Sequence, residues 1–208
     1  MRMEKFPNEI FVTGTDTGIG KTVVSALLTQ GLKATYWKPI QSGLQEETDT
    51  QALKRLTGLP EHHFKEETYR LNEPLSPHAS AAIDDVEITM NAFSIPDYAT
   101  DHLIVEGAGG LMVPMNDTAM IIDLIKALEI PVLLVARSEL GTLNHTFLSL
   151  EALRKRGIPI IGVIMNGPKN RSNRKAIEKY GQIEVLTEID QIDDINSQKL
   201  SEIFKHKF

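Results

Sequence analysis

The sequence predicts a doubly wound α/β fold, in which a mainly parallel sheet carries helices on both faces, within a single domain spanning residues 1–208. Apolar, β-rich runs alternate along the chain with segments of helical periodicity. The runs 131–135 and 159–164 are apolar on both faces, as buried parallel strands are. A glycine-rich loop separates the first expected strand from the first expected helix. Such folds bind ligands at the carboxyl edge of the strands.

The elements follow in order along the chain. Strands are expected at 10–13, 35–38, 102–105, 132–136, 160–165 and 183–186, with a weaker one at 68–71. Helices are expected at 22–32, 49–57, 119–128, 143–156, 171–180 and 197–206. Residues 72–101, which contain Pro74, Pro77 and Pro96, predict a long irregular connection with some helix.

The loop after the first strand has the composition of a phosphate-binding loop. Residues 13–22 read Thr-Gly-Thr-Asp-Thr-Gly-Ile-Gly-Lys-Thr. The usual spacing would place glycine at position 15, where this chain has Thr15, with Gly14 one place earlier. In such loops backbone N–H groups surround phosphate oxygens, the lysine reaches the β/γ-phosphates and the hydroxyl ligates Mg²⁺. The segment therefore predicts binding of a nucleoside triphosphate, with Lys21 and Thr22 in these roles.

Composition narrows the class of protein. The net charge of −6 and a pI near 5.5 argue against nucleic acid or an anionic membrane as partner. The absence of cysteine excludes disulfides and thiolate metal sites. Neither a bilayer-spanning apolar stretch nor an N-terminal signal core is present. We therefore expect a cytoplasmic protein.

Three further positions suggest chemistry, and each has a simpler alternative. Lys38 ends the second expected strand, where it faces the phosphate loop or is an ordinary surface lysine before a turn. Asp49 opens a helix, which suits a helix N-cap, a Mg²⁺ ligand or both. Glu106 ends an apolar strand before glycines, where nucleotide-hydrolysing folds hold a metal ligand.

Taken together, these motifs resemble the dethiobiotin synthetase family. The resemblance rests on Phe-Val-Thr-Gly-Thr-Asp-Thr at 11–17 with Gly-Lys-Thr at 20–22, Lys-Pro and Ser-Gly at 38–43, and Val-Glu-Gly-Ala-Gly-Gly at 105–110. Ser-Pro-His at 76–78 and Leu-Gly-Thr-Leu-Asn-His at 140–145 add to it. The likeness covers about residues 10–190.

The resemblance implies an ATP- and Mg²⁺-dependent ligase of biotin biosynthesis. The expected reaction closes a ureido ring on 7,8-diaminopelargonate with CO₂ to give dethiobiotin, ADP and phosphate. It would pass through a carbamate and a carbamic-phosphoric anhydride, without a covalent enzyme nucleophile. The family is homodimeric, with the substrate at the subunit interface, so a homodimer is expected here.

Site residues follow from the resemblance by position. The implied catalytic residues are Thr17, Lys21 and Lys38, and the implied metal ligands are Thr22, Asp49 and Glu106. Nucleotide contacts are implied for Gly18, Ile19, Gly20, Lys21, Thr22, Val23, Asp49, Glu106, Gly107, Ala108, Gly109, Asn166, Gly167, Ile189, Asp190 and Gln191, with adenine on the Asn166 amide. Substrate contacts are implied for Thr17, Lys38, Ser42, Gly141, Thr142, Leu143 and Asn144, the last four from the partner subunit. Two positions depart from the family pattern: Gly18, where an acidic residue is expected, and Asp190, where proline is.

Three other classes share part of this pattern. Partitioning and septum-site ATPases carry a signature lysine five places before the loop lysine, where this chain has Asp16. A GTPase would need an Asn-Lys-x-Asp motif, which the Asn-Gly-Pro-Lys at 166–169 does not supply. Cobyrinate synthase relatives add an amidotransferase domain with a nucleophilic cysteine, and this chain has no cysteine.

Overall fold

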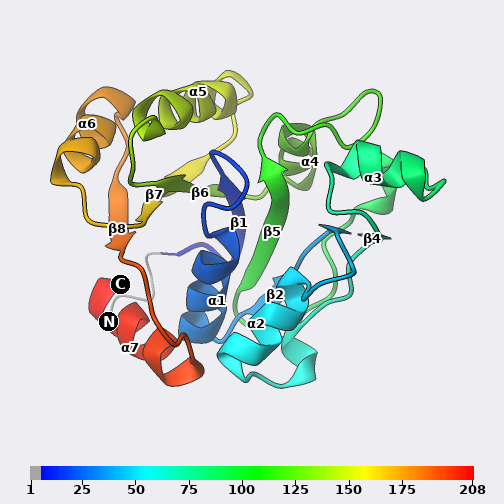
Figure 1. Cartoon of the computed structure of the whole chain (residues 1–208), viewed down its shortest axis with the longest axis horizontal. Helices are drawn as coiled ribbons and strands as arrows, with labels where there is room; N and C mark the ends of the chain where they lie inside the picture. The colour runs from blue at the N-terminus through cyan, green and yellow to red at the C-terminus, as the bar shows by residue number, and fades with distance from the viewer. Residues whose placement is uncertain (1–5) are drawn as a thin grey trace.

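A six-stranded parallel sheet forms the centre of the protein, whose computed structural model describes residues 6–208 (Figure 1). The strand order is β2-β5-β1-β6-β7-β8, and every neighbouring pair is parallel. The strands are β1 Glu9–Gly14, β2 Thr35–Trp37, β5 Leu103–Gly110, β6 Val132–Arg137, β7 Ile160–Asn166 and β8 Val185–Ile189. Because all six point the same way, their carboxyl ends share one edge, with β1 at the point where the strand order reverses.

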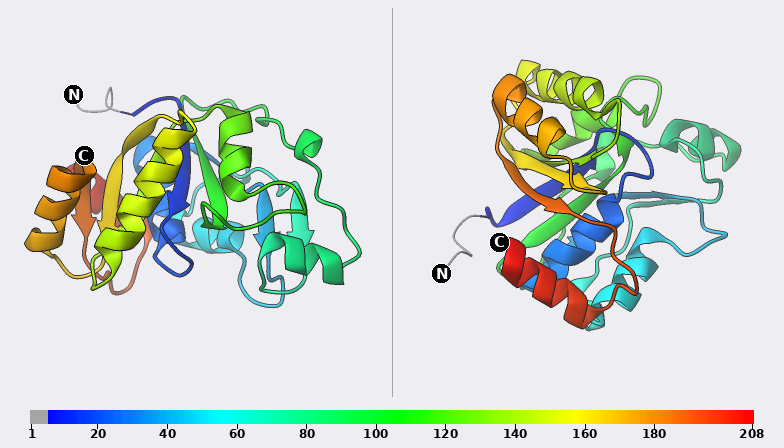
Figure 2. Two further views of the ribbon diagram at one scale, coloured as in Figure 1. Left: turned by 90° about the horizontal axis from the view of Figure 1, so that it is seen from above. Right: turned by 60° about the vertical axis from the view of Figure 1, so that its left-hand side comes forward.

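Helices cover both faces of this sheet, as Figures 1 and 2 show. One face carries α1 Lys21–Leu32, α2 Asp49–Thr57 and α7 Ser197–Lys207, and the other carries α4 Ile121–Leu128, α5 Thr142–Lys155 and α6 Arg171–Gly181. Each face has its own apolar core. Gly31 lets α7 lie close to α1, because a Cβ atom at this position would be 2.1 Å from Cγ of Phe204. The doubly wound parallel fold predicted from the sequence is confirmed.

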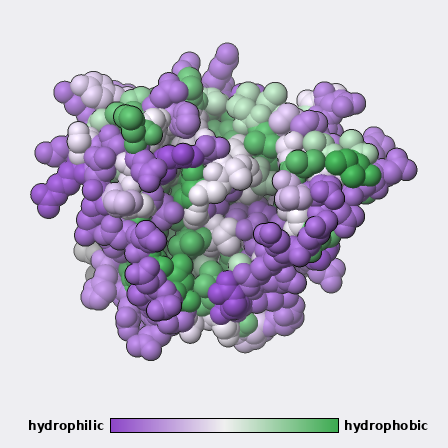
Figure 3. All heavy atoms as spheres, in the orientation of Figure 1, coloured by the Kyte–Doolittle hydropathy of each residue, from purple (hydrophilic) through white to green (hydrophobic). Residues whose placement is uncertain are grey.

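A smaller unit lies beside β2. Strands β3 Ile40–Ser42 and β4 Tyr69–Leu71 form a separate two-stranded parallel sheet, and α3 Pro77–Ile83 follows it. Single 3₁₀ turns occupy Glu61–His63 and Met90–Ala92. Apolar atoms gather over α3 in Figure 3, where the Ile83 residue is 61% exposed.

Three expectations about the elements need correction. Strand β3 was not expected, since three residues that include Gln41 and Ser42 give no apolar period. Strand β5 continues through Glu106 to Gly110, although glycine disfavours strands, because Gly110 pairs with Gly14. Strand β8 lies two to three residues later than expected. The helix expected within the connection 72–101 is present as α3. Among residues 6–208, no helix combines the length and apolar character that crossing a bilayer requires.

Candidate functional site

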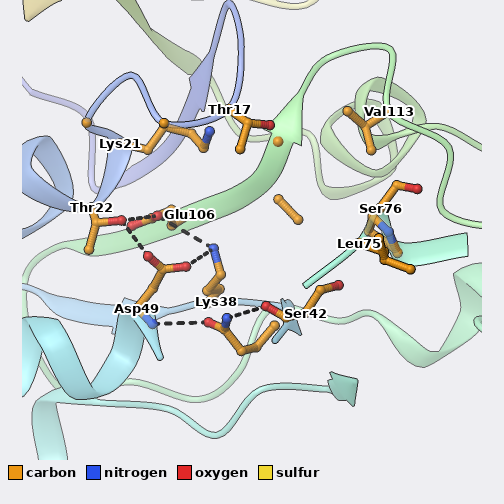
Figure 4. Close-up of a pocket in the computed structure, with 16 residues that line it drawn as sticks. Thr17, Lys21, Thr22, Lys38, Ser42, Asp49, Leu75, Ser76, Glu106 and Val113 are labelled. Atoms are coloured by element: carbon orange, nitrogen blue, oxygen red, sulfur yellow. Dashed lines mark hydrogen bonds and ion pairs between the residues drawn. The ribbon is translucent and has the colours of Figure 1, made fainter. Parts of the chain in front are cut away.

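A cavity of about 280 Å³ opens at the carboxyl edge of the sheet, beside β1 and β5 (Figure 4). Segments far apart in the sequence line it: the loop after β1, the start of α1, residues 38–42, the start of α2, the end of β5 and residues 75–77. The predicted site residues in its lining are Thr17, Gly18, Gly20, Lys21, Thr22, Lys38, Ser42, Asp49, Glu106, Ala108 and Gly109. The fold therefore brings most of the predicted site into one place.

The phosphate loop runs from the end of β1 into α1. Gly20 immediately precedes the helix with φ of 90°, a conformation that favours glycine, and a Cβ atom there would lie 2.1 Å from Nδ2 of Asn166. That Asn166 amide donates a hydrogen bond to the Ile19 carbonyl oxygen at 2.9 Å. The Lys21 ammonium donates to the Asp16 carbonyl oxygen at 3.0 Å, within the loop itself. Sequence-distant β7 thus helps to shape the loop.

Two carboxylates converge on the hydroxyl of Thr22, the second residue of α1. The Thr22 Oγ1 atom lies 2.5 Å from Oδ1 of Asp49 and 3.1 Å from Oε1 of Glu106. Glu106 is almost fully buried in β5, while Asp49 reaches the same point from the start of α2. The three predicted metal ligands therefore share one location, and they present hard oxygen atoms of the kind that Mg²⁺ prefers.

Lys38 points into the same cluster, as Figure 4 shows. Its ammonium lies 2.8 Å from Oδ2 of Asp49 and 3.5 Å from Oε1 of Glu106, and donates a 3.5 Å hydrogen bond to the Gly107 carbonyl oxygen. The residue is 4% exposed. The surface-lysine alternative for Lys38 is therefore wrong.

Burial and charge act against each other on these groups. Burial lowers the pKa of the Lys21 ammonium, only partly opposed by Glu106. Burial alone would also lower the pKa of Lys38, but the Glu106 and Asp49 carboxylates outweigh it and raise that pKa. Burial would raise the pKa of Asp49, but Lys38 outweighs it and holds that pKa below its usual value. Lys38 and Asp49 are consequently held as a charged pair.

Asp49 does not cap its helix. The N-cap of α2 is Thr48, whose hydroxyl accepts from the Gln51 backbone N–H at 3.3 Å while the Gln51 side chain accepts from the Thr48 N–H at 2.9 Å. Because this capping box satisfies the helix start, the Asp49 side chain is free to turn toward Thr22 and Lys38. The N-cap alternative for Asp49 is therefore wrong.

Five residues that line the cavity had no site role predicted from the sequence: Gln41, Leu75, Ser76, Pro77 and Val113. Gln41 is buried, and its Oε1 accepts from the Asp49 backbone N–H at 3.2 Å while its Nε2 donates to the Ser42 carbonyl oxygen at 2.8 Å. It links the segment that carries Lys38 to the start of α2. No sequence motif marks Gln41, since its role depends on the unexpected strand β3.

Other predicted residues lie outside this cavity. Ile19, Val23 and Gly107 belong to the same segments but do not line it. Gly167 lies beside the end of β8, where its N–H donates to the Ile189 carbonyl oxygen at 2.8 Å, and Asp190 pairs with Lys169 at 3.7 Å. Gln191 follows as an exposed residue. These residues neighbour the phosphate loop through Asn166 and Ile19.

The start of α5 is also separate from the cavity lining. Gly141 is the N-cap, and the Thr142 hydroxyl turns inward to donate to the Arg137 carbonyl oxygen at 2.6 Å. Leu143 is half-buried and Asn144 is exposed. Within one chain, residues 141–144 do not contribute to the Lys38 cluster.

Comparison with known proteins places the chain in a family. A family model described as an AAA domain matches residues 8–199, so the chain belongs to that family. It is 46% identical, over 97% of its length and 94% of theirs, to the ATP-dependent dethiobiotin synthetases of Brucella ovis and Brucella canis. It is 51% identical to the biotin biosynthesis bifunctional protein of Bordetella avium, matching 92% of this chain but only 41% of that longer protein.

The solved structures that match this chain are similar to it in fold alone. The chain superposes on a ParA family ATPase from Chlorobium tepidum with a TM-score of 0.52 at 14% identity, covering 96% of this chain and 92% of that one. It superposes on the MinC:MinD complex of Aquifex aeolicus with a TM-score of 0.51 at 13% identity, covering 97% and 90%. At such low sequence identity these matches do not decide whether the chain belongs with the partitioning ATPases or with the synthetases. The extensive sequence identity does: the chain belongs to the family of ATP-dependent dethiobiotin synthetases.

Proposed function

We propose that this chain catalyses the ATP-dependent closure of a ureido ring on 7,8-diaminopelargonate with CO₂, giving dethiobiotin, ADP and phosphate. The observation that carries the proposal is the convergence of the phosphate-loop lysine, a second buried lysine and two carboxylates on one cavity. The names of the Brucella relatives support the same activity. We further propose that residues 1–208 act as one catalytic domain in the cytoplasm.

The nucleotide would occupy the loop and the neighbouring strand ends. The N–H groups of Gly18 to Val23 and the N-terminus of α1 would surround the phosphates, with Lys21 on the β/γ-phosphates. Asn166 and Gly167, with Ile189, Asp190 and Gln191, would hold the base, and Gly107 to Gly109 would allow close approach of the backbone. The contact between Asn166 and the loop carbonyl of Ile19 supports a base site beside the phosphate loop.

The oxygen atoms of Thr22, Asp49 and Glu106 fit a Mg²⁺ ion. The described residues contain no group of three His, Cys, Asp or Glu side chains suited to a metal. Two of the oxygen donors here are carboxylates, from Asp49 and Glu106, and the third is the Thr22 hydroxyl. That set matches nucleotide sites in which phosphate oxygens and water complete the coordination. A bound Mg²⁺ would neutralise charge that develops on the transferring phosphate.

The diamine would enter on the Lys38 side of the cavity. Ser42 lines this side, and its buried Oγ has no hydrogen-bond partner among residues 6–208. Together with Thr17 it would orient the carbamate formed when an unprotonated substrate amine adds to CO₂. Lys38 is held protonated by its carboxylate neighbours and would clamp the carbamate. In that position a carbamate oxygen would attack the γ-phosphorus of ATP.

Ring closure would follow in the same place. The second amine attacks the carbonyl carbon of the carbamic-phosphoric anhydride, the bond from that carbon to the phosphoryl oxygen breaks, and phosphate leaves, while the proton lost by the amine passes to phosphate or solvent. The proposed homodimer would supply Gly141 to Asn144 of the partner subunit for the distant substrate carboxylate. Gly141 and Asn144 are exposed at the start of α5, away from their own chain's cavity, which supports a role toward a second subunit.

Product analysis tests the proposal. We expect the purified protein to form dethiobiotin, identified by mass spectrometry, only when diaminopelargonate, bicarbonate, ATP and Mg²⁺ are all present. ADP should appear in about equal amount, with little ATP turnover when diaminopelargonate is left out. Steady ATP hydrolysis without the diamine, or no dethiobiotin under any condition, would overturn the proposed function.

A further inference from the structure

Tyr36 occupies a position in the site that the proposed reaction does not yet use. Its side chain is fully buried, and its phenol donates a hydrogen bond to Oε2 of Glu106 at 3.1 Å. The other carboxylate oxygen, Oε1, faces Thr22 at 3.1 Å and Lys38 at 3.5 Å. The two oxygens of Glu106 are therefore divided between a buried phenol and the cavity.

The surrounding structure fixes where this phenol lies. Tyr36 belongs to β2 and is paired with Ile104 of β5, two residues before Glu106 and on the same face of the sheet. Its ring packs edge-on against Phe64, with ring centroids 6.5 Å apart and planes at 66°. Its carbonyl oxygen accepts from the Lys65 N–H at 2.9 Å. A phenol held this firmly restricts rotation of the carboxylate that it contacts.

Packing alone does not account for the hydroxyl. A phenylalanine would fill the same apolar space, whereas a hydroxyl in the core is costly unless it finds a partner. Here the partner is a buried carboxylate, and a hydrogen bond to a charged acceptor is about twice as strong as a neutral one. Without Tyr36, Oε2 of Glu106 would lose its only hydrogen-bond donor among those described for residues 6–208.

We propose that Tyr36 is a positioning residue that holds Oε2 of Glu106 so that Oε1 is presented to the Mg²⁺ that accompanies ATP. The inference rests on the proposed function, specifically on Glu106 as a metal ligand. Partners that orient metal-binding carboxylates commonly contribute a factor of about 10–100 in metal affinity. Tyr36 would supply that orientation from the neighbouring strand without contacting metal, nucleotide or substrate.

The test compares Tyr36→Phe with Tyr98→Phe. Tyr98 also donates from its phenol to a carboxylate, Oε1 of Glu9, at 3.2 Å, but it does so at the opposite edge of the sheet. Mn²⁺ affinity in the presence of a non-hydrolysable ATP analogue would be measured by electron paramagnetic resonance. We expect Tyr36→Phe to weaken it by about 10–100-fold and Tyr98→Phe to leave it unchanged. The Mg²⁺ concentration for half-maximal ring closure should rise in parallel, with kcat largely recovered at saturating Mg²⁺.

A coupling experiment separates positioning from general structural support. In a Glu106→Gln background, Tyr36→Phe should change Mn²⁺ affinity no further, because the two residues act together. Equal losses in both backgrounds, or unchanged Mn²⁺ affinity in Tyr36→Phe, would overturn the inference. Those outcomes would leave the proposed function intact if wild-type protein forms dethiobiotin, whereas absence of product from wild-type protein would overturn the function itself.

Discussion

Replacing Lys21 by alanine is expected to reduce kcat/KM for ATP by at least about 100-fold, equivalent to about 2.7 kcal/mol of transition-state stabilisation. The substitution removes a cation that we place on the phosphates in both the ground and transition states, so KM should rise and kcat should fall. Burial lowers the pKa of Lys21, so the charged ammonium does not stabilise the nucleotide-free protein. The thermal midpoint without nucleotide should therefore change little.

Steady-state kinetics and circular dichroism on the same preparation measure both effects. Lys126→Ala is the matched control, because Lys126 is an exposed lysine on α4, the helix layer opposite α1. It should behave as the wild type does. Near-normal kinetics in Lys21→Ala would mean that the loop after β1 does not bind phosphate.

Lys38→Gln should fold and bind ATP with Mg²⁺, yet lose ring-closing activity by at least about 100-fold. Glutamine keeps a polar side chain, one bond shorter than that of lysine, and removes its charge, so the loss reports mainly on the electrostatic clamp on the carbamate. Removing one partner of a buried ion pair leaves carboxylates without a counter-charge, which typically costs about 3–5 kcal/mol. When both proteins are free of ligand, the variant should therefore unfold at a lower temperature than the wild type. Nucleotide with Mg²⁺ should restore part of the lost thermal stability.

Calorimetry for ATP binding and product assays with diaminopelargonate distinguish the possible roles of Lys38. Lys54→Gln serves as control, since Lys54 also forms an ion pair, with Glu61 on the surface, but lies outside the cavity. Wild-type ring closure in Lys38→Gln would remove Lys38 from the reaction. A large loss of ATP affinity would reassign it to the nucleotide site.

Elements with a strong period were predictable from the sequence, whereas those created by tertiary pairing were not. The strand before Lys21 and the helix after it follow from apolar period and loop chemistry. Strand β3 and the extension of β5 past Glu106 depend on pairing with distant strands, which overrides the low strand preference of glutamine and glycine.

The site shows the same division. Lys21, Thr22, Asp49 and Glu106 were assigned from motifs, and the fold does bring them together. Tyr36 was missed, although the two-residue period of a strand places it on the same face as Lys38, which was the signal available. Gln41 offered no such signal, because it reaches Asp49 from strand β3, which has no apolar period.

The central claim is that ATP phosphorylates a substrate carbamate in the cavity between Lys21 and Lys38. The most direct test is whether oxygen is transferred from bicarbonate to phosphate. Ring closure would be run briefly with ¹⁸O-labelled bicarbonate in unlabelled water, and the phosphate analysed by mass spectrometry. Because a carbamate oxygen attacks the γ-phosphorus and leaves with it, about one labelled oxygen should appear in phosphate for each dethiobiotin formed. Phosphate whose new oxygen comes from water, or formation of AMP and pyrophosphate, would contradict the account.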